Sequence, residues 1–519
     1  MVIRPTDLRQ CFAIISCLSI CGCGGGGGGS AIADPDASKQ WYLYGNDSDP
    51  SIVSISLPKN GRYRGRGVLV SIVDNGLDLL HEDLAENIAW GNFSYLPFEY
   101  GFSNADHGTA VAGIIAASES NGFGARGIAP GANLVAYNAL RAPSTDNIAD
   151  ALVRGIDRVS ISNNSWGDFN SWGEPLHLKP QIETSLATGT TQGRGGLGIV
   201  YIFSAGNGAV IDTNGIPSDN VNYSGLVNNR YTLPVCAVDE HGKKANYSET
   251  GATLLVCAPS RGSDSKFGIF TTDVTGDLGY NTIKTPEDAS NKSYTALFGG
   301  TSAAAPMVSG VVALMLEANP AMSWRDVRYV LASTARKNDP TESGWSTNGA
   351  GLHINHSYGF GLVDASAALA VSLQWVNLPL PESIEAFESV NRPIPDNDSN
   401  GLESTIRIVD ALTVEFVDVV FDAPDHARIG DLVVTLTSPS GTKSVLAERH
   451  NQVFGTFRYG DWRFGSLRHL GEAATGLWRL SVQDLRAGEV GTWKSWRLLV
   501  HGYRGTGVRS INEELGSGL

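Results

Sequence analysis

The sequence has little positive charge and few cysteines outside its first residues. Its 519 residues hold 38 Lys and Arg against 53 Asp and Glu, a formal net charge of −15. No cluster of Lys and Arg supplies the basic surface that nucleic-acid phosphates require, so a nucleic-acid partner is excluded. Four of the six cysteines precede residue 24, which leaves Cys236 and Cys257. Both lie in apolar, strand-like runs without metal-ligand spacing, so free buried thiols are favoured over a bridge, which an exporting compartment would also allow.

The apolar run near the N-terminus, Cys11 to Ile20, is too short to span a bilayer. Basic residues precede it, and Cys21-Gly22-Cys23 followed by a run of glycines resembles a bacterial lipoprotein signal with Cys23 as the lipidated residue. We expect a signal peptide over 1–23, a Gly-rich tether over 24–33, and an exported protein that is a cell-envelope lipoprotein or extracellular. A lipid anchor would be its contact with a membrane. Cleavage that gives a secreted protein stays an alternative.

Buried strands alternate with helices over residues 34–373, which predicts an α/β domain with a parallel sheet. The expected strands are near-continuous apolar runs of the kind buried on both faces of a sheet: Gly67–Asp74, Gly196–Ala205, Thr232–Val238 and Ala252–Ala258. The expected helices are Thr109–Ser118, Ser302–Ala318 and Ser323–Ala335, the last opening with a capping-box-like Ser323 and Asp326.

Residues 374–503 have a different pattern, in which prolines are followed by short segments of alternating apolar and polar residues. Trp478, Leu480 and Val482 fall on one face of such a segment. The pattern predicts a second, all-β sandwich domain, followed by a tail over 504–519.

Three segments carry catalytic residue types. Asp74 ends a predicted parallel strand, where ligands of open sheets bind. His107 opens a helix of small residues, and Ser302 begins a long apolar helix in which Pro306 suits the first turn.

The blocks DNGLD, DHGTAVAG and GGTSAAAP resemble, in this order, the three active-site blocks of the subtilisin superfamily. Their chain order Asp, His, Ser differs from the chymotrypsin and α/β-hydrolase orders. The resemblance implies a serine endopeptidase with Asp74, His107 and Ser302 as its triad, and with Asn207 of the SAGNG block as oxyanion donor. The alternatives are an esterase with the same triad and a binding-only surface protein.

The blocks HSYGFGLVDASAAL and HARIGDLVVTLTSPSGT resemble the kexin/furin branch, whose members carry a jelly-roll P domain. The resemblance implies that Ser165, Trp166 and Gly167 pair with the substrate backbone. Asn170 and Ser224 stand where this branch has carboxylates that select paired basic residues, as does Asn75. Broader specificity than strict dibasic cleavage is therefore expected, although nearby Asp168 or Asp219 would offer a replacement carboxylate.

Calcium and a helper protein are also implied by the family. The first calcium site would use the side chains of Asp34, Asp83 and Asn121 with the carbonyls of Ser118, Phe123 and Ala125, and the second would use Asp219 and Glu249. Solvated loop carboxylates are the simpler interpretation of the same residues. Subtilases usually fold with an N-terminal propeptide, yet the catalytic domain begins here soon after Cys23. We therefore expect a separate chaperone or inhibitor protein that acts in trans.

Overall fold

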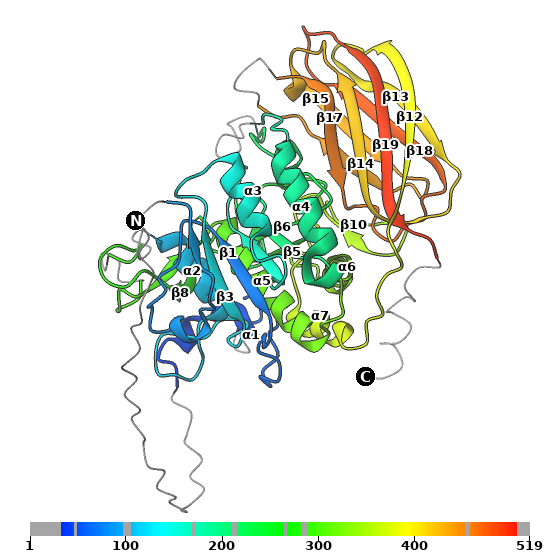
Figure 1. Cartoon of the computed structure of the whole chain (residues 1–519). Helices are drawn as coiled ribbons and strands as arrows, with labels where there is room; N and C mark the ends of the chain where they lie inside the picture. Colours follow the sequence, from blue (N-terminus) through cyan, green and yellow to red (C-terminus); the bar gives the residue numbers. More distant parts are fainter. Residues whose placement is uncertain are drawn as a thin grey trace, which may run out of the picture.

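The computed structural model describes residues 33–45, 49–96, 105–168, 173–209, 215–263, 265, 267–282, 288–451 and 457–505. They form an α/β domain and a β domain that stands beside it (Figure 1). The predicted signal peptide, the tether up to residue 32, Asn170 and the tail beyond residue 505 lie outside the described residues.

The first domain is built on a seven-stranded parallel sheet of order β2-β3-β1-β4-β5-β6-β7. Its strands are β1 Leu69–Val73, β2 Phe93–Ser94, β3 Asn133–Asn138, β4 Ile161–Asn164, β5 Val200–Ser204, β6 Thr232–Val238 and β7 Val256–Pro259. Two small antiparallel pairs accompany it: β8 Ile269–Thr272 with β9 Tyr294–Phe298, and β10 Ser346–Thr347 with β11 His353–Ile354. The apolar runs predicted as parallel strands are thus strands of one buried sheet.

Helices cover both faces of this sheet because successive side chains of each strand point to opposite faces. On one face Ile72 and Ile202 pack with α2 (Asp106–Ala116) and α5 (Thr301–Ala318). On the other face Val73 and Phe203 pack with α3 (Thr145–Val153) and α4 (Pro180–Gln192). The remaining helices are α1 Trp41–Tyr44, α6 Trp324–Thr334 and α7 Ala365–Ser372.

Two helix starts test the sequence prediction in detail. The predicted capping box of α6 is present, since Ser323 Oγ accepts from the Asp326 N–H and Asp326 Oδ2 accepts from the Ser323 N–H. The expectation for Pro306 is wrong. Helix α5 begins at Thr301, so Pro306 lies inside the helix rather than in its first turn.

The second domain is a sandwich of two four-stranded antiparallel sheets, of orders β12-β19-β14-β17 and β13-β18-β15-β16. Its strands are β12 Glu382–Pro393, β13 Asp398–Ile408, β14 Thr413–Ala423, β15 Leu432–Thr437, β16 Lys443–Ala447, β17 Tyr459–Ser466, β18 Gly476–Asp484 and β19 Thr492–Tyr503. The alternation seen in the sequence is confirmed, because Trp478, Leu480 and Val482 are all fully buried between the sheets.

Polar and charged side chains join the two domains. The Arg325 guanidinium of α6 donates to Glu415 of β14, with Nε 2.9 Å from Oε2, and Arg328 Nη2 lies 3.2 Å from the same oxygen. Asn222 Nδ2 donates to the carbonyl of Gly465 at 2.8 Å. Removing one member of a buried ion pair typically costs ~3–5 kcal/mol, because the other charge is then left buried without a partner.

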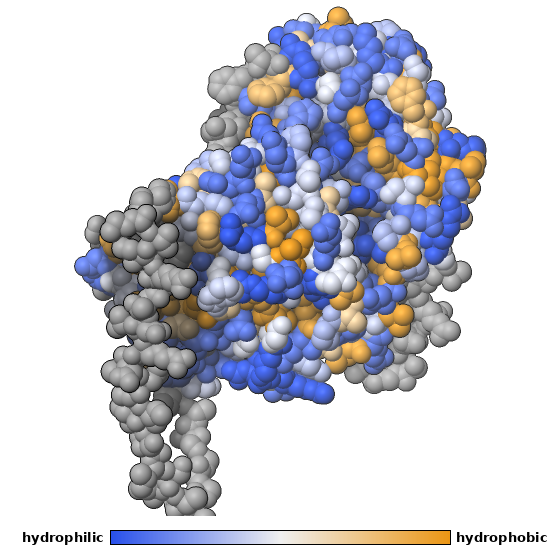
Figure 2. Space-filling view, viewed as in Figure 1, coloured by the Kyte–Doolittle hydropathy of each residue, from blue (hydrophilic) through white to orange (hydrophobic). Residues whose placement is uncertain are grey.

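Exposed hydrophobic side chains are distributed over the described surface. Figure 2 shows a mostly hydrophilic view with hydrophobic patches that include part of the second domain. The exposed large hydrophobic side chains are spread over both domains, from Trp90 and Leu80 in the first to Val409 and Val490 in the second.

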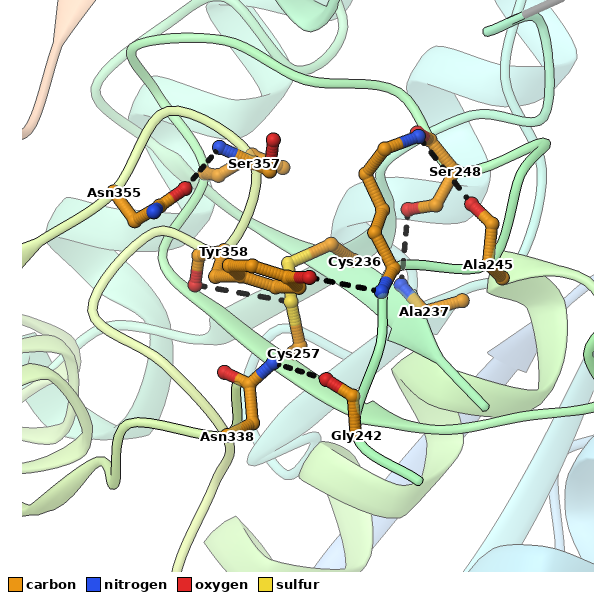
Figure 3. The surroundings of a disulfide bond; sticks show 12 residues. Cys236, Ala237, Gly242, Ala245, Ser248, Cys257, Asn338, Asn355, Ser357 and Tyr358 are labelled. Atoms are coloured by element: carbon orange, nitrogen blue, oxygen red, sulfur yellow. Dashed lines mark hydrogen bonds between the residues drawn. A yellow bond between two sulfur atoms is a disulfide. The ribbon is translucent and has the colours of Figure 1, made fainter. Parts of the chain in front are cut away.

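Cys236 and Cys257 form a disulfide, so the favoured expectation of free thiols is wrong. The cysteines lie on neighbouring strands β6 and β7, and the parallel register places them directly opposite each other with a Cα–Cα distance of 4.3 Å. Figure 3 shows the bridge beneath the ring of Tyr358, whose carbonyl lies 3.7 Å from Cys257 Sγ. The sequence showed two apolar strands, but it did not show their register.

We predict that replacing both cysteines by alanine lowers the free energy of unfolding by about 3 kcal/mol, because the bridge closes a loop with a sequence separation of 21 residues. Urea unfolding with and without reductant measures the effect. Reductant should lower the midpoint of the wild type and leave that of the double variant unchanged. Equal shifts for both proteins would contradict the bridge.

Candidate active site

A cavity of about 640 Å³ opens at the carboxyl ends of the central strands. Asp74 follows β1, Ser165 follows β4 and Ala205 follows β5, so the sheet itself brings these segments to one edge. The residues that line the cavity include Asp74, His107, Ser165, Trp166, Gly167, Asp168, Asn207, Ser224, Glu249 and Ser302. All four predicted catalytic residues therefore face one space.

Asp74 and His107 form a buried pair. His107 Nδ1 lies 2.9 Å from both Asp74 oxygens, and the carboxylate itself is 1% exposed. Burial opposes the imidazolium form, but the charge of Asp74 and its hydrogen bond outweigh this and raise the pKa of His107. The hydrogen bond also fixes the tautomer, with the proton on Nδ1 and the lone pair on Nε2.

Asn75 has a structural role that sequence reasoning missed. Its side-chain Nδ2 donates to Asp106 Oδ1 at 2.9 Å, and its Oδ1 accepts from the Gly108 N–H at 3.0 Å. The amide therefore fixes the first turn of α2 on both sides of His107. The backbone after Asn75 packs closely against the same turn, since a Cβ on Gly108 would lie 1.9 Å from the Gly76 carbonyl oxygen.

Ser302 is held by reciprocal hydrogen bonds with Ser165. Ser302 Oγ donates to the Ser165 carbonyl at 3.1 Å, and Ser165 Oγ donates to the Ser302 carbonyl at 3.0 Å. In a regular helix the N–H four residues later would donate to the Ser302 carbonyl, but that residue is Pro306, which has no N–H. The proline inside α5 thus leaves the carbonyl of Ser302 available to the end of β4.

Asn207 is oriented by the residue next to Ser302. Its Oδ1 accepts from both the N–H of Thr301 at 2.9 Å and the Thr301 Oγ1 at 3.0 Å. Because the oxygen is held in this way, the amide NH₂ is the end that remains for another acceptor. Gly300, with φ +74°, allows the turn that brings Asn207 and Ser302 together.

The predicted substrate-binding segment forms one wall of the cavity. Trp166 is buried against Phe203, with ring centroids 5.3 Å apart, and its carbonyl accepts from Ser204 Oγ. At Gly167 a Cβ would meet no atom within 4 Å, so the backbone there borders open space. Asn170 lies outside the described residues.

Asp168 supplies a carboxylate to the cavity wall. Its Oδ2 accepts from Ser224 Oγ at 2.6 Å, so the predicted residue Ser224 faces the cavity with an acid beside it. Burial raises the pKa of Asp168, against smaller opposing effects of Ser224 and Lys179.

Asp219 and Glu249 lie on either side of Gly208, a residue that lines the cavity. A Cβ on Gly208 would lie 2.8 Å from Asp219 Oδ2 and 3.1 Å from Glu249 Oε1, so the two carboxylates flank this glycine. The Gly208 N–H donates to Glu249 Oε1 at 3.0 Å. Burial and the charge of Asp219 raise the pKa of Glu249 well above its ordinary value. Two carboxylates in so small a space disfavour double ionisation unless a cation balances them.

The other predicted calcium residues also converge. The N–H groups of Ser120 and Asn121 donate to the two oxygens of Asp34, and Asn121 Nδ2 donates to Asp83 Oδ1 at 2.8 Å. Asp83 Oδ2 is buried without a well-formed hydrogen bond from the described residues. Burial raises the pKa of Asp83 to about 7, and the nearby charge of Asp34 adds to this effect.

The carbonyls of Ser118, Phe123 and Ala125 belong to the same loop, which follows α2. Over the described part of the chain, no group of three or more His, Cys, Asp or Glu side chains is placed to hold a metal ion. The donor set of the loop is two carboxylates, one amide and backbone oxygens, which is the oxygen chemistry that Ca²⁺ accepts.

A parallel sheet that carries an Asp, a His and a Ser at its carboxyl edge defines the fold of subtilisin-like proteins. Residues 65–361 match the subtilase family model, and residues 415–500 match the model of the proprotein convertase P-domain. The chain therefore belongs to the subtilase family. Its second domain is a P domain, which joins it to the kexin-like members.

Relatives share both domains with this chain. A PC3-like endoprotease variant B of Hydra vulgaris is 32% identical over 87% of this chain and 63% of its own length. The proprotein convertase subtilisin/kexin type 6 of Homo sapiens is 32% identical over 90% of this chain and 48% of its own length. The chain thus spans about half to two thirds of these relatives. A serine protease of Aeromonas sobria, solved in complex with the chaperone ORF2, is 27% identical with a TM-score of 0.80, covering 91% of this chain and 96% of its own.

We predict that Asp74→Asn lowers the pKa of His107 below its ordinary value, because an amide cannot stabilise the imidazolium while burial still opposes it. NMR titration of the histidine ring protons measures the shift. His81, whose pKa burial lowers through surroundings that do not include Asp74, is the internal control and should keep its midpoint. An unchanged pKa of His107 would assign its shift to Asp106 instead.

Proposed function

We propose that the chain is a serine endopeptidase whose triad is Asp74, His107 and Ser302. The observation that carries the proposal is that a buried Asp74–His107 pair and Ser302 line one cavity together with an oriented Asn207. Ser302 would attack the scissile carbonyl while His107 Nε2 takes its proton. The same imidazolium would then donate that proton to the leaving amine, and Asp74 would stabilise it throughout.

Asn207 is the proposed oxyanion donor. Its NH₂ is the end of the amide that Thr301 leaves available, and the N-terminus of α5 adds backbone dipoles at the same point. Both donors would then be preorganised for a tetrahedral intermediate, as electrostatic stabilisation requires.

A peptide substrate is favoured over an ester. Ser165, Trp166 and Gly167 continue beyond β4 along the cavity as backbone that an extended peptide can pair with. An ester pocket needs no such edge. The intact catalytic constellation likewise argues against the binding-only alternative.

The part of the cavity lined by Asp168, Ser224 and Glu249 is called the primary pocket below. We propose that this pocket prefers one basic substrate side chain, because Asp168 offers a carboxylate beside Ser224. A second basic residue of the substrate would meet an amide rather than a carboxylate at Asn75, and this amide is hydrogen-bonded to Asp106 and Gly108. The specificity is then basic at one position and broader than strict dibasic cleavage.

Calcium is proposed at both predicted sites. Asp34, Asp83 and Asn121, with the carbonyls of Ser118, Phe123 and Ala125, fit an oxygen site, and the buried Asp83 Oδ2 supports this assignment. Asp219 and Glu249 fit a second site under the pocket floor. The ion would balance carboxylate charge and stabilise the loops there.

Export and a partner in trans complete the proposal. The N-terminal pattern supports a lipoprotein or secreted form, with Cys23 as the candidate for lipidation. The Aeromonas sobria protease was solved with a chaperone, which supports a separate chaperone for this chain as well.

We predict that the wild type cleaves a mixed peptide library and that Ser302→Ala does not, with cuts concentrated after Lys or Arg. Mass spectrometry of the products gives both results at once. Asn207→Ala should keep the cut sites and lose about 10²- to 10³-fold in kcat, the loss known for such a donor in subtilisins. Cleavage by Ser302→Ala equal to that of the wild type would refute the assigned nucleophile.

We predict that saturating calcium raises the Tm of the wild type more than that of Asp83→Asn, which keeps the second proposed site, because a ligand that binds the folded state at 100 times its Kd stabilises by about 2.7 kcal/mol. Thermal unfolding in calcium and in EDTA measures the difference. Glu82→Gln is the matched control, since exposed Glu82 accepts from Tyr294 OH and a glutamine can still do so. An undiminished calcium shift in Asp83→Asn would contradict the first site.

A further inference from the structure

A loop of the P domain, residues 448–451, lies against the back of the primary pocket. Glu448 Oε1 accepts hydrogen bonds from Asn220 Nδ2 at 2.5 Å, from Thr250 Oγ1 at 2.9 Å and from His356 Nε2 at 3.3 Å. One P-domain carboxylate therefore binds three separate segments of the catalytic domain.

His450 ties two further segments to the same loop. Its Nε2 lies 2.9 Å from the Gly173 carbonyl, while its Nδ1 lies 2.9 Å from the Glu448 carbonyl and 3.0 Å from Tyr223 OH. The fit is close, because a Cβ on Gly173 would lie 2.4 Å from His450 Cδ2. Next to it, the N–H of Asn451 donates to the Pro217 carbonyl at 3.1 Å.

These segments carry the side chains of the pocket. Thr250 directly follows Glu249, and Tyr223 directly precedes Ser224. Glu249 and Ser224 both line the cavity, and Ser224 in turn holds Asp168. The P-domain loop thus acts on the pocket through residues one position away from it.

The charge of Glu448 suits this role. Burial alone would raise its pKa, but the hydrogen bonds from His356, Asn220 and Thr250 and the charge of His356 lower the pKa to about 2. The side chain is therefore ionised at ordinary pH. Hydrogen bonds to an ionised acceptor are roughly twice as strong as neutral ones, so the three donors are held firmly.

We propose that Glu448 and His450 are positioning residues of the primary pocket, through which the P domain sets which substrate side chain is accepted. The inference rests on the proposed peptidase function. It differs from a purely stabilising interface such as the Arg325–Glu415 pair, which lies between α6 and β14 and touches no residue of the cavity.

The test compares full-length wild type, Glu448→Ala, Glu448→Gln and Glu183→Gln. Glu183 makes an exposed ion pair with Arg463 of the P domain at 2.7 Å and does not line the cavity, so its variant is the matched interface control. Peptide amides that differ only in the side chain before the scissile bond give kcat, KM and the preference for basic over neutral residues. Titration with a fluorophosphonate normalises every rate to competent active sites.

Glu448→Ala is expected to raise KM for the preferred substrate about tenfold and to reduce the preference by a similar factor, with kcat within about threefold. Glu448→Gln keeps an oxygen for Asn220 and Thr250 but loses the charge, so its KM and preference should lie between those of Glu448→Ala and the wild type. Glu183→Gln should match the wild type. Wild-type KM and preference in the titrated sites of Glu448→Ala would overturn the inference, whatever its Tm.

A second variant covers the case in which Glu448→Ala does not fold. Thr250→Val removes one donor to Glu448 at nearly constant shape and should change KM and preference in the same direction by about threefold. An unchanged preference in Thr250→Val overturns the inference in that case. A wild type that neither cleaves nor reacts with the fluorophosphonate would instead overturn the proposed function on which it rests.

Discussion

The hydrogen bonds between the first turn of α5 and the ends of β4 and β5 hold the candidate catalytic groups in place. Ser302 and Ser165 exchange two bonds, and Thr301 holds the oxygen of Asn207. Each contact joins segments that are far apart in sequence but adjacent at the sheet edge. Since the apolar length of α5 is buried against β4 to β7, the position of its first turn is fixed by the core rather than by the loops around it.

The candidate catalytic residues could be named from the sequence because they lie in short blocks that resemble those of the subtilisin superfamily. Asp74 follows a strand that is apolar except for Ser71, and His107 and Ser302 lie in the first turns of helices whose small and apolar residues are mostly buried. The sandwich fold of the P domain could also be predicted, because alternating apolar residues such as Trp478, Leu480 and Val482 indicate a strand with one buried face.

The errors and omissions concern spatial relations that no local pattern contains. The register of β6 on β7 decides that Cys236 meets Cys257, and a shift of one residue would have separated them. The role of Pro306 depends on where α5 begins, which sequence signals give only to within a turn or so. Glu448 and His450 belong to a domain that the sequence showed only as separate from the catalytic one.

Several carboxylates lie close together around the pocket, and their mutual repulsion has to be compensated. Glu249 and Asp219 are buried and Asp168 is half-buried near the same cavity, and desolvation opposes the charge of Glu249 and Asp168. Charges of one sign in such a space are tolerated only when cations or hydrogen-bond donors compensate them. In the proposed function, calcium compensates the pair at the floor and a basic substrate side chain compensates Asp168 on the wall.

The P domain contributes to that balance without adding charge to the cavity. Glu448 is a fourth carboxylate close to the pocket, yet its charge is directed at Asn220, Thr250 and His356 on the far side of the pocket segments. It therefore holds the backbone next to Glu249 through its hydrogen bond from Thr250. A neutral residue at position 448 could fill the same space, but it would not hold three donors with the strength of an ionised acceptor. The charge of Glu448 thus holds the P-domain loop on the segments of Asn220 and Thr250, beside the residues that line the pocket.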